Sequence, residues 1–150
     1  TMSKGVLAGY PLYGLRVTLY DGKHHPVDSS DMAFQLAGSQ AIRDAVETAK
    51  PILLEPVYNI SITVPDQYMG DVMGDLNSKR GRIVGMEQVG KRQGIQATAP
   101  LSELSRYSID LKSLTSARGS FTMEYDSYEQ IPDEIAQKVI ADSKSENESE

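Results

Sequence analysis

The segment 65–81 has the clearest pattern of hydrophobic and polar positions in the chain. Its apolar side chains recur at the spacing i, i+3, i+4 and i+7, which forms one stripe along a helix. They are Met69, Val72, Met73 and Leu76. Pro65 suits the first helical position because its missing N–H would have no partner there. Gly81 is expected to end the helix in the left-handed conformation. The pattern therefore predicts one amphipathic helix.

Apolar residues alternate with polar ones in four further segments, which predicts four strands. The segments are 58–64 before the helix, 83–89 and 95–99 after it with a polar turn at 90–93, and 121–125. A second helical stretch begins at Pro100 and is ended by Gly119. Its inner side carries Leu101, Leu104, Tyr107, Leu111 and Leu114. The predicted order β-α-β-β-α-β is the ferredoxin-like arrangement of an α+β domain.

Residues 1–54 offer fewer elements. They are a strand at 14–20, a turn at 21–22, a helix from Ser29 or Ser30 to about Lys50, and a short strand at 52–54. One helix on one or two strands cannot cover both apolar sides. We therefore expect residues 1–54 to be the second half of a domain, with an exposed apolar face on 15–19 and 34–49.

The chain ends in a charged segment. A short closing helix is predicted over 131–141, begun by Pro132 and two acids. Residues 142–150 contain four acids, one Lys and few apolar side chains, so we expect a disordered acidic tail. This tail carries −3 of the formal net charge of −6.

Composition narrows the classes of function. Hydrophobic residues make up 39% of the chain and charged residues 24%, as in an ordinary globular protein. The acidic balance argues against a nonspecific nucleic-acid binder, although local basic patches can still bind RNA. Cysteine is absent, and no apolar run suits a membrane span or a signal peptide, so we expect a cytoplasmic protein. No catalytic set stands out, so we expect no enzyme activity in this chain.

Six segments, in chain order, resemble the carboxyl end of translation elongation factor G. They are LAGYP at 7–11, VTLYDG at 17–22, VDSSDMAF at 27–34, ILLEPV at 52–57, YMGDVMGDLNSKRG at 68–81 and SFTMEYDSYEQIP at 120–132. The resemblance implies that residues 1–54 are the second half of domain IV, an incomplete ribosomal S5 domain 2-like half-domain. It implies that residues 55–141 are domain V, which is ferredoxin-like in that family.

The family is a GTP-dependent ribosomal translocase, so the resemblance implies a part in protein biosynthesis. This chain contains no G-x-x-x-x-G-K-[ST] loop, because the GTPase domain of the family lies upstream. GTP and Mg²⁺ would belong to the parent protein, and this fragment would need no cofactor or metal. The implied partners are the ribosome, at the sarcin–ricin loop of 23S rRNA and the base of the L11 stalk, and the A-site tRNA and mRNA.

The first candidate site is the tip loop, residues 21–30, where the family has Asp-Gly-Ser-Tyr-His-(Glu or Asp)-Val-Asp-Ser-Ser. Here His24 replaces Tyr and Pro26 replaces an acid. His25 aligns with the tip histidine that approaches the codon–anticodon region, and an imidazole can stack on a base or hydrogen-bond a 2′-hydroxyl. The residues expected to contact RNA are Lys23, His24, His25, Asp28, Ser29 and Ser30. A metal site that includes Asp21 is the weaker interpretation, because adjacent histidines in an extended loop point apart.

The second candidate site is 105–116, which resembles the family segment Gly-Tyr-Ala-Thr-Asp-Leu-Arg-Ser that contacts the sarcin–ricin loop. We assign Tyr107 and Leu111 to the core. Contacts to RNA phosphates come chiefly from cations and hydroxyls, so the residues expected there are Arg106, Lys112, Ser113 and Arg118. Lys112 stands where the family has Arg, which keeps the charge but loses the bidentate fork.

Lys79, Arg80 and Arg82 form a third candidate, a basic cluster at a predicted helix end. They could contact the ribosome, but complementing the helix dipole on a solvated face explains them equally well. Two other functions stay open at this point. The parent could be a paralogue used in ribosome recycling or ribosomal protection, or residues 1–54 could pair with a second copy of a stand-alone interaction module.

Overall fold

The computed structural model describes residues 1–147, and the chain divides into two compact units. One unit consists of residues 54–130, and the other contains residues 1–53 and 131–150. Among the described residues, no helix is both long and apolar enough to cross a membrane.

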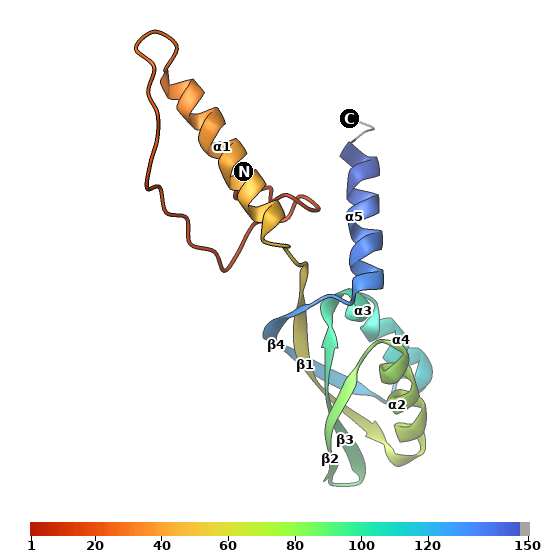
Figure 1. Ribbon diagram of the computed structural model, residues 1–150. Helices are drawn as coiled ribbons and strands as arrows, with labels where there is room; N and C mark the ends of the chain where they lie inside the picture. The colour runs from red at the N-terminus through yellow and green to blue at the C-terminus, as the bar shows by residue number, and fades with distance from the viewer. Residues whose placement is uncertain (148–150) are drawn as a thin grey trace. The chain divides into compact units, whose positions relative to one another are not determined.

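Residues 54–130 form a four-stranded antiparallel sheet with helices packed on it (Figure 1). The elements are β1 (Leu54–Pro65), η1 (Asp66–Tyr68), α2 (Met69–Ser78), β2 (Arg82–Val89), β3 (Arg92–Pro100), α3 (Leu101–Leu104), α4 (Tyr107–Leu114) and β4 (Ser120–Gln130). The strand order is β2-β3-β1-β4, and each neighbouring pair is antiparallel. This is the ferredoxin-like topology that the sequence predicts.

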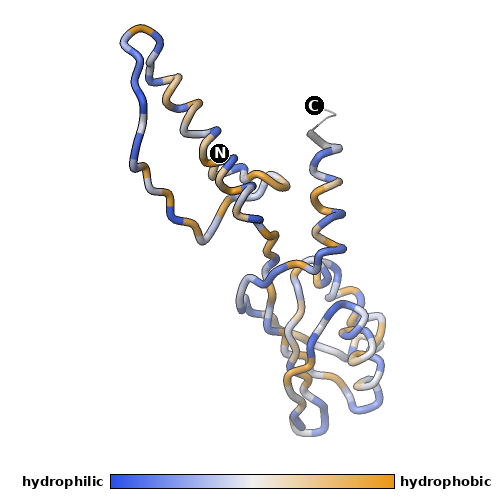
Figure 2. The backbone as a smooth tube through the Cα atoms, viewed as in Figure 1, coloured by the Kyte–Doolittle hydropathy of each residue, from blue (hydrophilic) through white to orange (hydrophobic). Residues whose placement is uncertain are grey.

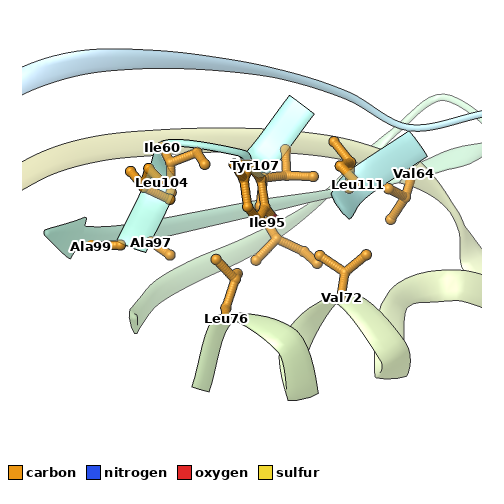
Figure 3. Packing of buried hydrophobic residues seen from close by; sticks show 11 residues of the cluster. Ile60, Val64, Val72, Leu76, Ile95, Ala97, Ala99, Leu104, Tyr107 and Leu111 are labelled. Carbon is orange, nitrogen blue, oxygen red and sulfur yellow. The ribbon is translucent and has the colours of Figure 1, made fainter. Parts of the chain in front are cut away.

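The core of this unit lies between the helices and one face of the sheet (Figure 3). Side chains that are opposite each other on paired strands share a face, as Ile62 and Ile95 do. The buried cluster consists of Ile60, Ile62, Val64, Val72, Leu76, Ile95, Ala97, Ala99, Leu104, Tyr107 and Leu111. The predicted stripe of α2 therefore faces the core, with Met69 and Met73 packed at its edge.

The two ends of α2 differ from the prediction. Residues 66–68 form a separate 3₁₀ turn before the helix. At the other end the left-handed residue is Arg80, with a φ of 56°, and not Gly81. Gly81 is required for a different reason. Its N–H donates to the Leu76 carbonyl at 2.7 Å, and a Cβ would lie 2.7 Å from that same oxygen.

The second helical stretch and the hairpin turn also differ from their predictions. The predicted single helix after Pro100 is interrupted at residues 105–106, which separates α3 from α4. The hairpin turn is shorter than predicted, because Val89 pairs with Arg92 and leaves a two-residue loop. Gly90 has a φ of 65°, which the first position of such a turn favours.

Residues 1–53 contain one long helix, α1 (Asp31–Thr48), at the predicted position. Ser30 is its N-cap, and the Ser30 hydroxyl accepts a hydrogen bond from the Ala33 N–H at 3.1 Å. None of its 18 residues is buried. The apolar side predicted for a half-domain is therefore exposed, and Phe34 leaves 49% of its surface accessible.

The prediction of a strand at 14–20 is wrong. The segment is irregular, and Val17 and Leu19 expose 56% and 90% of their surfaces. Apolar and polar residues alternate along it (Figure 2). A strand also needs a neighbour that bonds its N–H and C=O groups, however, and residues 1–53 provide none. The short strand predicted at 52–54 is likewise reduced to Leu54, the first residue of β1.

The last helix, α5 (Asp133–Asn147), is longer than predicted. The expectation of a disordered tail from residue 142 is wrong for 142–147, which form the final turns of α5. Extending an existing helix costs far less than starting one, so a polar sequence can continue it. Residues 148–150 of the predicted tail lie outside the described residues.

Candidate nucleic-acid interface

The tip loop precedes α1 directly, and the chain turns at residues 26–28 before the N-cap (Figure 1). The six predicted contact residues of this loop lie within eight consecutive positions. Lys23, His24, His25, Asp28 and Ser30 are exposed, and Ser29 is half-buried. The turn therefore gathers imidazole, hydroxyl and ammonium groups, all of which can hydrogen-bond RNA, into one short exposed segment.

His25 is the centre of the hydrogen bonds in this loop. Its backbone N–H donates to the Ser29 hydroxyl at 2.6 Å, and the Ser29 N–H donates to the His25 carbonyl at 3.2 Å. The ring Nδ1 lies 3.3 Å from the backbone nitrogens of both Val27 and Asp28, and 3.2 Å from Asp28 Oδ2. The side chain nevertheless stays 65% exposed, so the loop holds the ring without burying it.

The geometry gives little support to a metal site in this loop. His25 and Asp28 are in contact, but Asp21 accepts a hydrogen bond from the neighbouring Gly22 N–H at 2.7 Å. Residues 1–147 contain no group of three or more His, Asp or Glu side chains arranged to hold a metal ion.

The second candidate site is the outer surface of α4 and the turn after it. Tyr107 and Leu111 are buried in the core, as the spacing predicts. The residues assigned to RNA contact are all exposed, and they are Arg106, Lys112, Ser113 and Arg118. The apolar face of α4 therefore packs in the core, and its polar face, which carries the predicted RNA-contacting residues, is exposed to solvent.

The turn after α4 is strained in a way that the sequence did not reveal. Ser116 and Ala117 both adopt positive φ, at 50° and 62°, although neither is glycine. The buried Thr115 stabilises this turn, because its hydroxyl donates to the Leu111 carbonyl at 2.6 Å and accepts from the Gly119 N–H at 2.8 Å. Backbone strain of this kind concentrates at functional sites, so its position beside the exposed Arg118 supports Arg118 as a candidate site residue.

Tyr68 is a residue near this turn that sequence reasoning missed. Hydrogen bonds with Ser116 and then Gln67, with Arg118 nearby, lower the pKa of the Tyr68 hydroxyl. Tyr68 and Ser116 are far apart in sequence, and no local pattern brings them together. Only the folded structure brings Tyr68, at the end of η1, to Ser116 in the turn after α4.

Lys79 and Arg80 make ion pairs inside residues 54–130. Lys79 Nζ lies 2.6 Å from Asp75 Oδ1 and 3.2 Å from Asp110 Oδ2, so it joins α2 to α4. Partial burial alone would lower the pKa of Lys79, but the two carboxylates reverse this effect and raise it. With 17% of its side chain exposed, Lys79 is better placed to hold α4 than to reach a phosphate.

Arg80 is held in the same manner by acids from other elements. Its guanidinium contacts both carboxylate oxygens of Glu55, at 2.6 and 2.9 Å, and Glu103 at 3.1 Å. These hydrogen bonds, those of Glu55 first, raise the pKa of Arg80. The bidentate pair compensates the left-handed backbone at Arg80. Arg82 differs, because it contacts Glu129 but leaves 67% of its side chain exposed.

The fold defines an α+β protein whose residues 54–130 form a ferredoxin-like domain and whose residues 1–53 contain one exposed helix and an irregular segment. Residues 1–50 match the family "Elongation factor G, domain IV", and residues 52–139 match "Elongation factor G C-terminus". The chain therefore belongs to the elongation factor G family. It is similar to a protein from Thermus thermophilus whose crystal structure is known, with 41% identity and a TM-score of 0.81. The match covers 96% of this chain but only 22% of that one.

Proposed function

We propose that this part of elongation factor G contacts the ribosome during GTP-dependent translocation of tRNA and mRNA in the cytoplasm. The observation that carries the proposal is the tip loop, whose own backbone and hydroxyl groups fix an exposed imidazole in place. A fixed and exposed donor loses little conformational entropy when it meets RNA. In this proposal the tip loop meets the A-site tRNA and mRNA.

The exposed side of α4 would meet the sarcin–ricin loop of 23S rRNA, close to the base of the L11 stalk. Arg106, Lys112 and Arg118 supply positive charge there, and Ser113 supplies a hydroxyl. The overall negative charge of −6 makes nonspecific RNA binding weak, so local geometry would select the site. Both surfaces bind and position RNA, and GTP hydrolysis would belong to the upstream part of the parent.

Sedimentation of the chain with 70S ribosomes tests this proposal. We expect the chain to sediment with ribosomes and to protect the sarcin–ricin loop from chemical modification. Lys112→Ala should reduce binding, and Lys138→Ala on α5 serves as a matched control of equal charge change. A parent protein that fails to bind, or bound chain without protection of that loop, would contradict the proposal.

A second function, self-association, is favoured by one specific observation. The apolar residues Leu19, Val17 and Phe34 of residues 1–53 are exposed at 90%, 56% and 49%. Light scattering over a range of concentrations would detect pairing with a second copy, and a constant monomer mass would exclude it. A role in ribosome recycling or ribosomal protection can be distinguished from a role in translocation. The test replaces the corresponding segment of a translocase with this one and measures translocation.

A further inference from the structure

The face of the sheet opposite the helices carries polar side chains and a hollow. Asn59 and Ser61 alternate along β1 with the buried Ile60 and Ile62, so they lie on this other face. Gln96 of β3 lies directly across from Ser61 in the register of the two strands. The hollow has a volume of about 190 Å³ and is lined by Asn59, Ile60, Ser61, Val84, Gln96 and Ala97.

Two carboxylates fix the direction in which the amide groups of this hollow point. Asn59 Nδ2 donates to Asp126 Oδ1 at 2.8 Å, and Gln96 Nε2 donates to Glu87 Oε1 at 3.4 Å. An ionised carboxylate only accepts hydrogen bonds, so each amide turns its nitrogen toward the acid and its oxygen away from it. Hydrogen bonds from Ser127 and then Asn59 lower the pKa of Asp126, which keeps that carboxylate ionised at neutral pH.

The hollow is therefore rich in hydrogen-bond acceptors. The amide oxygens of Asn59 and Gln96 and the hydroxyl oxygen of Ser61 belong to exposed side chains that line it. Gly85 of β2 lies across from Gln96, and a Cβ on Gly85 would be 3.9 Å from Gln96 Oε1. Because Gly85 has no side chain, this oxygen stays open to a ligand.

The charges around the hollow favour a cation. Two carboxylates adjoin it through the hydrogen bonds described above, and Glu124 of β4 lies across from Asn59 on the same face. Arg82 is a cation on this face, but it is ion-paired with Glu129. A phosphate would be repelled by the three acids, so RNA does not fit this hollow. The cations proposed to contact RNA lie on or beside α4.

We propose that this hollow binds the guanidinium group of an arginine in a basic segment of a partner protein. Asn59 and Ser61 are two residues apart on one strand face, a spacing of roughly 6–7 Å. A planar guanidinium with five N–H donors can reach acceptors spread in this way, whereas an ammonium acts as a point charge. Val84, which is 69% exposed, provides an apolar contact for the stem of the arginine. The proposal is independent of the tip loop and of α4.

The first test measures binding of a model peptide to the full chain by nitrogen–proton correlation NMR. The probe is acetyl-Gly-Gly-Arg-Gly-Gly-amide, and the controls carry lysine or citrulline, which keeps the shape of arginine without its charge. We expect the arginine peptide to shift the backbone amides of Ser61, Val84 and Gln96 with a Kd on the order of 1 mM. The lysine peptide should bind about threefold and the citrulline peptide about tenfold more weakly.

Three results of this first test would overturn the proposal. One is equal binding of the arginine and citrulline peptides. Another is the absence of shifts at these three amides at about 10 mM arginine peptide, where a site of this affinity would be mostly filled. The third is a shift of the same amides by a sarcin–ricin RNA hairpin, which would make RNA the occupant.

Substitutions on the same face test whether the acceptors bind the peptide. Ser61→Ala and Gln96→Leu each remove one acceptor and should weaken the arginine peptide about three- to tenfold. Thr122→Ala is the matched control, because Thr122 lies across from Ser61 but outside the hollow, and it should leave binding unchanged. These side chains are exposed, so circular dichroism should show an unchanged fold. Equal binding by all three variants would contradict the proposed site.

A second pair of variants tests the orienting carboxylates. Glu87→Gln keeps the size of the side chain but lets the Gln96 amide turn either way, so binding of the arginine peptide should weaken about threefold or more. Asp71→Asn on α2 changes the net charge equally and should have no effect. Equal losses would show attraction to the overall negative charge instead. A tenfold gain in Arg82→Gln would make Arg82 of this chain the occupant and overturn the role of a partner.

Discussion

The helices α1 and α2 both carry apolar side chains on one side, but they differ in how much of that side is buried. α2 has 10 residues and buries Val72 and Leu76 completely against a sheet. α1 has 18 residues and buries none of them. Both helices lie within the segments that their local sequence predicts, although α2 is shorter than predicted, because caps and propensity act within a few residues. The comparison shows that burial, unlike helix formation, depends on whether the chain supplies a second layer.

The largest expected difference between the two regions concerns core truncation. Leu76→Ala should destabilise residues 54–130 by about 2–5 kcal/mol, because it removes a fully buried side chain and leaves a cavity. Leu36→Ala on α1 is the matched control, and at 67% exposure it should change stability by only about 0.5 kcal/mol. Urea unfolding followed by circular dichroism measures both. Similar losses for the two variants would show that α1 is covered in solution.

Two glycines at α2 should respond to alanine with opposite signs. Gly81→Ala places a Cβ 2.7 Å from the Leu76 carbonyl oxygen and should cost about 1–3 kcal/mol. Gly74 lies inside α2 with open space around it, so Gly74→Ala should stabilise by about 0.5–1 kcal/mol through helix propensity. Thermal unfolding of the two variants gives the signs directly. Stabilisation by Gly81→Ala would contradict the close approach.

The third prediction compares Lys112, an exposed cation on α4, with Lys79, a cation held in ion pairs. Lys112→Ala should weaken binding to a sarcin–ricin RNA hairpin and reduce the salt dependence of binding by about one phosphate contact. Lys79→Met should leave that salt dependence nearly unchanged, because Lys79 is paired with Asp75 and Asp110. Affinities measured over a range of salt concentrations provide the slopes. If Lys79→Met changes the slope of affinity against salt concentration, Lys79 contacts RNA and is not only a structural cation.

The smallest effect is expected at alkaline pH. The pKa of Lys79 is raised by its carboxylate partners, and the pKa of Tyr107 is raised by burial and then by nearby Asp75. A raised pKa means that the folded state holds its proton more tightly. Stability should therefore be fully present below about pH 10 and decline above it.

Lys79→Met and Tyr107→Phe should each flatten this alkaline decline, as measured by urea unfolding at several pH values. Tyr107→Phe should also cost little at neutral pH, because the Tyr107 hydroxyl is buried without a hydrogen-bond partner in the structure. An unchanged alkaline decline in both variants would show that other groups cause it.

Most of the ferredoxin-like topology, the start of α1 and the exposure of the tip loop were predictable from the sequence. Each depends on signals within a few residues, such as the alternation in 58–64 or the cap at Ser30. The strand at 14–20 was mispredicted because its pattern is local but its hydrogen bonds are not. The end of α5 was misplaced because composition alone does not fix where a helix stops.

The sequence by itself determined which segments are apolar on one side, which segments contain helices and which residues are charged. Only the tertiary structure decided that Lys79 pairs with Asp110, that Arg80 pairs with Glu55 and that Tyr68 meets Ser116. The physical reason is distance along the chain. Periodicity describes neighbours in sequence, whereas these three pairs join residues from different elements, which meet only after folding.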